Sequence, residues 1–150
     1  MITAVVPFRD WSEDRLRTCT GRLINFSAIS EIIVVDFGSQ TPINSVPDCR
    51  IVRVEADRWC LSEANNIGIV ESKTDVVMKI DADMHLDLSD DALTGLAHEV
   101  AEGKVSFYVL QATDFEFDES GKPSKKRLRP SWGEGGCNIF LRKDVRNRWV

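Results

Sequence analysis

The stretch "KIDADMHL" at residues 79–86 places two carboxylates, Asp81 and Asp83, one residue apart at the end of an apolar run. A buried carboxylate is unfavourable unless it is hydrogen-bonded, paired with a cation or bound to a metal. Side chains two residues apart on an extended chain point to the same side, so these two could converge on one hard divalent cation. The alternative is a solvated acidic turn, and the pair alone does not decide between the two interpretations.

Two further polar residues flank this pair. His85 has the same side-chain parity as the aspartates and is a candidate third metal ligand, although a histidine just outside a strand more often has a structural role. Lys79 lies beside the motif and is interpreted as facing the other side of the sheet.

The elements that must position these residues alternate between strands and helices. Strands are predicted at residues 2–8, 31–39, 50–56, 75–83 and 104–115, with a further candidate at 136–143. Helices are predicted after Ser12, over 61–72 with Ser62 as the cap, and from Ser89 to Val100 with Gly103 beyond the end. Apolar strands that alternate with helices indicate an α/β fold with a mostly parallel central sheet and helices on both faces.

Polar residues gather where three of the predicted strands end. The first strand is followed by "PFRD", the second ends in "DFGS" and the fourth ends in "DAD". Ligands of open α/β sheets bind beyond the carboxyl ends of the strands, near a topological switch point. The sequence therefore predicts a ligand site at this edge of the sheet.

The segment 118–136 interrupts the alternation and is predicted to be a loop, because it is rich in Gly, Pro, Ser and basic residues. Its cations include Lys125, Lys126, Arg127 and Arg129. We interpret them as a solvated charged loop. The alternative is a lid whose cations contact a phosphate or an acidic acceptor.

Length and composition fit one soluble globular domain, with 150 residues of which 43% are hydrophobic and 29% are charged. A net charge of -5 gives no general attraction to nucleic acid or to an anionic membrane. The cysteines, at positions 19, 49, 60 and 137, form no Cys-x-x-Cys pair, which argues against zinc and fits reduced thiols. Because there is no signal peptide and no apolar run of about 18 residues, we expect a cytoplasmic protein without a membrane span.

Four motifs in this order resemble a nucleotide-sugar-dependent glycosyltransferase with the GT-A fold. "PFRD" resembles the Pro-Phe-Arg motif of galactosyltransferases, "VVDFGS" resembles Val-Val-Asp-Asp-Gly-Ser, "ANNIG" resembles Ala-Arg-Asn-x-Gly, and "DAD" resembles the Asp-x-Asp signature. The resemblance covers about residues 2–144 and is closest to family 2 enzymes and to β-1,4-galactosyltransferase and chondroitin-synthase type domains. It implies a Rossmann-like three-layer sandwich over residues 1–150 that binds a nucleotide sugar, with UDP as the expected nucleotide.

The resemblance also implies a divalent ion, Mn²⁺ or Mg²⁺, between the two donor phosphates. Asp83 is the first choice as its ligand, while Asp81 either binds the ion directly, binds it through water or contacts the ribose. The remaining positions implied for the donor are Pro7, Phe8, Arg9, Asp36, Trp59 and Asn66.

Several of these positions have a structural alternative. Asp36 either holds the nucleobase or ribose, or forms the turn before Gly38. Arg9 either faces the nucleotide, in a loop shaped by Pro7 and Phe8, or pairs with another surface charge. Trp59 either stacks near the base or packs before a helix.

The chain also departs from the family pattern. Phe37 replaces the usual second Asp and Asn65 replaces the common Arg, which weakens the transfer of base and phosphate contacts. "EGGCNIFLRKD" resembles the Gly-Gly-x-x-x-x-x-Arg stretch on the acceptor side of these enzymes. Beyond that stretch, galactosyltransferase-like enzymes carry a Trp-Gly-x-Glu-Asp type segment that supplies the catalytic base. This chain has no such segment there, so we expect that it lacks the usual C-terminal acceptor part. Glu134, in "WGEGG", is the nearby acidic candidate for a base.

Three functions therefore compete. A metal-dependent glycosyltransferase that acts on a glycan or another hydroxyl-bearing acceptor is favoured by the motifs and their order. A non-catalytic nucleotide-sugar-binding module is favoured by the missing segment and opposed by Asp81 and Asp83. A nucleotidyltransferase would normally carry a Gly-rich basic loop after the first strand, and "PFRDWSED" is not Gly-rich.

Overall fold

The computed structural model of the chain describes residues 1–117, 123–128 and 136–146. Within them the main sheet has six strands in the order β3-β2-β1-β4-β8-β5. The parallel strands are β1 (Ile2–Phe8), β2 (Ile29–Phe37), β3 (Arg50–Val54) and β4 (Val76–Ile80). β8 (Cys137–Leu141) lies between β4 and β5 (Phe107–Val109) and is antiparallel to both. The expected mostly parallel sheet is confirmed.

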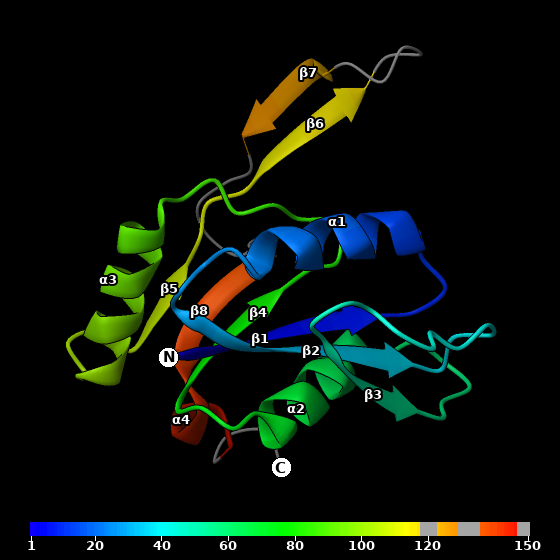
Figure 1. Cartoon of the computed structure of the whole chain (residues 1–150), viewed down its shortest axis with the longest axis horizontal. Coiled ribbons are helices and arrows are strands. Elements are labelled where there is room, and N and C mark those ends of the chain that lie inside the picture. The colour runs from blue at the N-terminus through cyan, green and yellow to red at the C-terminus, as the bar shows by residue number, and fades with distance from the viewer. Residues whose placement is uncertain (118–122, 129–135, 147–150) are drawn as a thin grey trace.

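Helices cover both faces of this sheet (Figure 1). On one face α1 (Glu13–Leu23) and α3 (Asp90–Ala101) contribute Leu16, Leu23 and Leu93 to a common core with the sheet. On the other face α2 (Leu61–Glu71) packs Ala64 and Ile69 against β1 and β2, and the short α4 (Arg142–Arg146) lies beside α2. This arrangement is the predicted GT-A or Rossmann-like three-layer sandwich. No helix in the described part of the chain is long and apolar enough to cross a bilayer.

The central strand β1 explains why the sequence predicts a sheet covered on both sides. Ala4 and Val6 belong to the core beneath α1 and α3, whereas Val5 belongs to the core beneath α2, and all three are fully buried. Gly68 lets α2 lie very close to this strand, since a Cβ at this position would be 2.2 Å from Cγ1 of Val5 and 3.1 Å from Cγ2 of Val35.

Two of the three predicted helix caps are confirmed. The hydroxyl of Ser12 accepts a hydrogen bond from the backbone N–H of Arg15 (3.4 Å), and that of Ser89 accepts one from Ala92 (3.2 Å). The prediction for α2 is wrong, because Cys60 is the residue before its first turn and Ser62 already lies inside the helix.

The predicted strand 104–115 is wrong, because the chain leaves the main sheet after the short β5. Residues Thr113–Phe117 form β6, which pairs with β7 (Pro123–Leu128) in a separate antiparallel hairpin (Figure 1). Lys125, Lys126 and Arg127 therefore lie on a strand and not on a loop, while Arg129 lies outside the described residues. Opposite charges pair across the hairpin, with Nζ of Lys125 3.0 Å from the Glu116 carboxylate.

Candidate functional site

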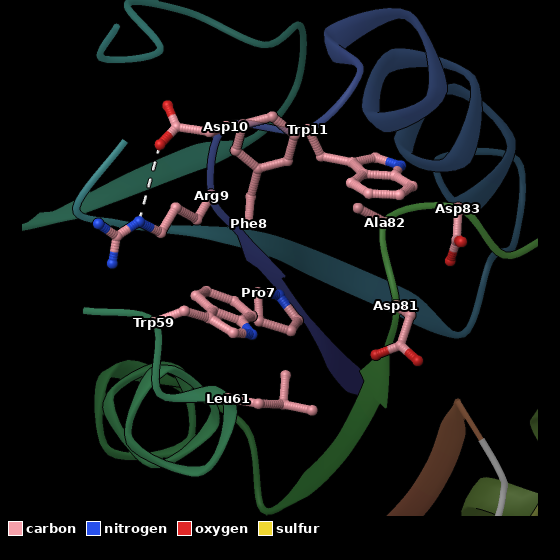
Figure 2. Close-up of a pocket in the computed structure, with 10 residues that line it drawn as sticks. All are labelled: Pro7, Phe8, Arg9, Asp10, Trp11, Trp59, Leu61, Asp81, Ala82 and Asp83. Carbon is pink, nitrogen blue, oxygen red and sulfur yellow. Dashed lines mark ion pairs between the residues drawn. The ribbon is translucent and has the colours of Figure 1, made fainter. Parts of the chain in front are cut away.

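A cavity of about 510 Å³ lies where β1 and β4 end (Figure 2). Its lining residues are Pro7, Phe8, Arg9, Asp10, Trp11, Trp59, Leu61, Asp81, Ala82 and Asp83. The cavity therefore brings together the end of β1 with its following loop, the segment before α2 and the residues after β4. This is the carboxyl edge of the parallel strands, where α/β sheets bind ligands, and the volume is in the range of small-molecule sites.

The two aspartates of the acidic motif both line this cavity, but not in the predicted geometry. β4 ends at Ile80, and the backbone N–H of Met84 donates to the carbonyl of Asp81 at 3.0 Å, which closes a turn. The expectation of a strand to residue 83 is therefore wrong, and the parity argument that united Asp81, Asp83 and His85 fails with it. In Figure 2 the Asp81 carboxylate does not point toward Asp83.

Lys79 engages Asp81, contrary to the expectation that it faces the other side of the sheet. Its ammonium lies 2.5 Å from Oδ1 of Asp81 and 3.3 Å from the carbonyl oxygen of Gly136. The backbone N–H of Asp81 donates to the same carbonyl at 3.0 Å. The chain is still extended between positions 79 and 81, so two-residue parity places both side chains on one face.

A divalent ion fits the donor chemistry of the acidic turn. Asp81 and Asp83 offer carboxylate oxygens to the cavity, which suits Mn²⁺ or Mg²⁺ when phosphate or water completes the coordination. Asp10, the other carboxylate of the lining, accepts from the backbone N–H of Gln40 at 2.7 Å and pairs with Arg9. Among the described residues, no group of three or more His, Cys, Asp and Glu side chains could hold a metal ion.

His85 accordingly does not complete a ligand set with the two aspartates. Its side chain is exposed and lies outside the cavity lining. Partial burial and the positive charge of Arg22 lower its pKa, while the negative charge of Asp83 opposes that change.

Arg9 and Asp10 join the loops that surround the cavity. Nη2 of Arg9 donates to the carbonyl of Asp57 (3.1 Å), and the backbone N–H of Asp10 donates to the hydroxyl of Ser39 (3.0 Å). Nη1 of Arg9 is buried and has no hydrogen-bond partner among the described residues. Nε of Arg9 also lies 3.7 Å from Oδ2 of Asp10. Arg9 therefore has a charged partner, and it lines the cavity as well.

Two exposed tryptophans form apolar parts of the lining. Trp59 is 44% exposed and meets Phe37 edge to face, with ring centroids 6.0 Å apart, so it both packs on the protein and lines the cavity. Trp11 is 58% exposed, and the guanidinium of Arg15 lies 5.9 Å from its ring. Figure 2 shows the two rings in different parts of the cavity, with Pro7 and Phe8 between them.

Asp36 and Asn66 are not part of the cavity lining. Asp36 is fully buried, and its Oδ2 accepts from Nη1 of Arg53 (2.9 Å) and from the backbone N–H of Ile43 (3.1 Å). These contacts match the turn-forming interpretation of this residue. Asn66 is half-buried on α2, and Glu134 lies outside the described residues.

Four lining residues are missed by the sequence interpretation: Asp10, Trp11, Leu61 and Ala82. Asp10 and Trp11 directly follow Arg9 at a strand end, so the rule that ligands bind at strand ends could have predicted them as lining residues. Leu61 begins α2 and is 41% exposed, a placement that no local pattern predicts.

Comparison with known proteins gives a likeness in fold alone. No protein-family model and no curated protein matches the chain. A solved structure of GalNAc-T7 with UDP, GalNAc and Mn²⁺ is similar over 100% of this chain, with a TM-score of 0.70 and 13% identity. The S. aureus TarS 1-349 structure in complex with UDP-GlcNAc is similar over 97%, with a TM-score of 0.64 and 14% identity.

Nucleotidyltransferases share the same architecture. The structure of CMP:2-keto-3-deoxy-manno-octonic acid synthetase complexed with CTP is similar over 97% of this chain, with a TM-score of 0.62 and 9% identity. The chain spans 76% of that synthetase, but 36% of GalNAc-T7 and 46% of the TarS chain. The predicted GT-A or Rossmann-like fold is therefore confirmed, and both enzyme classes share it.

Proposed function

We propose that the protein binds a UDP-linked sugar and transfers the sugar to a hydroxyl-bearing acceptor such as a glycan. The observation that carries this proposal is one cavity that joins the carboxylates of Asp81 and Asp83 to Arg9 and to exposed indole rings. A nucleotide sugar presents a diphosphate, which requires cations, and a flat base, which requires an apolar surface. UDP or UDP-GlcNAc in the two similar glycosyltransferase structures supports this choice of ligand.

Asp83 is the leading residue for the metal, because no hydrogen bond or ion pair within the described residues engages its carboxylate. Asp81 offers its second oxygen, since Oδ1 is already paired with Lys79. When bound, Mn²⁺ or Mg²⁺ would stabilise the negative charge that develops on the departing diphosphate. The Mn²⁺ in the GalNAc-T7 structure supports a divalent ion.

Trp59 and Arg9 suit the remainder of the nucleotide. The partly exposed indole of Trp59 is held by its edge-to-face contact with Phe37, so it offers a fixed surface for stacking the base. Arg9 carries a buried guanidinium nitrogen that has no hydrogen-bond partner in the described part of the chain, and a donor in this state is unfavourable. A small movement of the side chain toward the cavity would let this nitrogen donate to the diphosphate of a bound nucleotide.

Transfer requires, in addition, a base that removes the proton from the acceptor hydroxyl. Glu134 is our candidate for this role, and the alternative is a module that binds the donor without transferring the sugar. Nucleotidyl transfer is the second enzymatic candidate, because synthetases with the same fold are among the similar structures. The segment after β1, "RDWSED", lacks the glycines that such an enzyme would use around a triphosphate.

Calorimetric titration with UDP in the presence of Mn²⁺ or of a chelator tests the binding site. We expect Mn²⁺ to raise the affinity for UDP in the wild type and Asp83→Asn to remove most of that gain. Asp87→Asn is the matched control, because Asp87 is an exposed aspartate of the same segment outside the cavity lining. Equal binding of UDP with Mn²⁺ and with the chelator would contradict the metal assignment.

Product analysis separates the three activities. Release of UDP from UDP-sugars that requires an acceptor and is lost in Glu134→Gln indicates glycosyl transfer. UDP-sugar binding without release indicates a binding module. Release of pyrophosphate from CTP or UTP with a sugar phosphate would instead support nucleotidyl transfer and overturn our choice.

A further inference from the structure

Lys79 is a buried cation placed directly behind the acidic turn. It lies near the end of β4, is 8% exposed and does not line the cavity. Its ammonium bonds to Oδ1 of Asp81 and to the carbonyl oxygen of Gly136. A lysine this buried is rare unless its charge is paired, and Asp81 supplies the pairing carboxylate.

The Asp81 carboxylate lies against Gly136. A Cβ at position 136 would lie 2.6 Å from Oδ2 of Asp81 and 2.3 Å from the sulfur of Met84, so a larger residue there would require both side chains to move. The Gly136 carbonyl in turn accepts from the backbone N–H of Asp81. Asp81 is therefore held on both sides, by the ammonium at Oδ1 and by the surface of Gly136 beside Oδ2.

This arrangement restricts what Asp81 can offer a divalent ion. Oδ1 already accepts from the ammonium, and Oδ2 lies beside Gly136, so an ion at Oδ1 would have to share that oxygen with Lys79. The positive charge of Lys79 also repels a second cation at the same carboxylate, in a site partly shielded from water where such repulsion is strong.

A diphosphate would change this balance, because its negative charge would offset the positive charges of the ion and of Lys79. We infer that Lys79 is a positioning residue that holds Asp81 and weakens divalent-ion binding at the acidic turn, so that the ion binds well only together with a diphosphate. The inference rests on the proposed function, since the diphosphate belongs to the nucleotide donor. Binding of metal and of nucleotide would then be coupled, and each would raise the affinity for the other.

The test is a titration of the whole chain with Mn²⁺, with free ion measured by electron paramagnetic resonance, in the absence and presence of UDP. Lys79→Met removes the charge and keeps the length of the side chain, and Lys79→Gln removes the charge but keeps a donor for Gly136. We expect both variants to bind Mn²⁺ without UDP about tenfold more tightly than the wild type. Lys73→Met is the control, because Lys73 is a lysine with a 78% exposed side chain on another part of the surface.

If Lys79 had only a structural role, replacing it would lower folding stability but would not raise the affinity for Mn²⁺. Unchanged or weaker Mn²⁺ binding in a folded Lys79 variant would therefore overturn the inference. The wild type gives a second measurement that needs no variant, since Mn²⁺ should bind it about tenfold more tightly with UDP than without. Where UDP itself binds the wild type, equal Mn²⁺ affinity in these two conditions would overturn the inference as well.

The same titrations separate this inference from the proposed function. If UDP does not bind the wild type under any condition, the nucleotide-sugar proposal fails, and the comparison of Mn²⁺ affinities without UDP still tests the effect of Lys79. If UDP binds with Mn²⁺ but the Lys79 variants match the wild type, the proposed function stands and the role of Lys79 is wrong.

Discussion

Asp36 and Arg53 form an ion pair of 2.9 Å in which the carboxylate is completely buried and the guanidinium is 28% exposed. The same guanidinium donates to the carbonyl of Ser39 at 2.9 Å, and the hydroxyl of Ser39 accepts from the backbone of Asp10 in the cavity wall. The pair therefore supports the cavity through the loop that follows β2.

Arg53→Ala should lower the free energy of unfolding by about 3 kcal/mol, because it leaves the buried Asp36 carboxylate without its cation. The backbone N–H of Ile43 would remain as the only known partner of Oδ2 among the described residues. Urea denaturation followed by circular dichroism measures the loss. Arg58→Ala, at an exposed arginine nearby, should change stability little, and equal losses in both variants would contradict a special role for the pair.

Gly68→Ala should destabilise the protein by about 1–3 kcal/mol, because the new methyl group would overlap Val5 and push α2 away from the sheet. Gly95→Ala in α3 is the matched control, since a Cβ there meets no atom within 4 Å. That second change should stabilise the protein by roughly 0.5–1 kcal/mol through helix propensity. Urea unfolding of both variants checks the opposite signs, and two changes of the same sign would be inconsistent with this packing.

Trp59→Ala should weaken UDP binding by about 1–3 kcal/mol if the indole stacks on the base, whereas Trp59→Phe should retain part of the affinity. Calorimetric titration gives the affinities. Because Trp59 packs on Phe37, the thermal unfolding temperature of each variant must be compared with that of the wild type. Full affinity in a folded Trp59→Ala variant would exclude stacking on this residue.

The stability of the protein should fall as the pH rises above 9. Burial, together with the charges of Asp83, Cys49 and Asp81, raises the pKa of Cys19 from 9.0 to about 12. The folded protein therefore holds this proton more tightly than the unfolded chain, so the stabilisation is complete below pH 9 and is lost between pH 9 and about 12.

Cys19→Ala removes this titration and should reduce the slope of stability against pH by up to about 1.4 kcal/mol per pH unit. Urea unfolding of the variant and the wild type at several pH values on both sides of 9 provides the comparison. Below pH 9 the curves of unfolding free energy against pH should run parallel for the two proteins, with the variant expected to be the less stable one. Parallel curves above pH 9 as well would refute a raised pKa of Cys19.

Features set by short-range chemistry could be predicted from the sequence. β1 has its predicted bounds because its apolar run is continuous, and Ser12 and Ser89 cap their helices because a hydroxyl there reaches a free backbone N–H. The edge of the sheet that carries the cavity also follows from the order of strands and helices.

Features set by distant partners could not be predicted. The run "KVSFYVLQATDF" is consistent with one strand, but β8 pairs with only three of its residues, Phe107 to Val109, and the chain then leaves for the hairpin. Asp36 has its partner 17 residues away, and Lys79 meets a carbonyl 57 residues away. No local pattern encodes these contacts, so the sequence left two roles open for Asp36 and placed Lys79 on the other side of the sheet.

The position of β8 has a consequence for how the chain acquires its structure on the ribosome. β8 lies between β4 and β5, and β5 has no other strand partner within the described residues. Until residues 137–141 emerge, the growing chain carries β4 as an open edge with unpaired backbone groups. Long-range pairings of this kind form slowly, so the nascent protein is expected to need protection from aggregation until β8 has emerged and paired with β4.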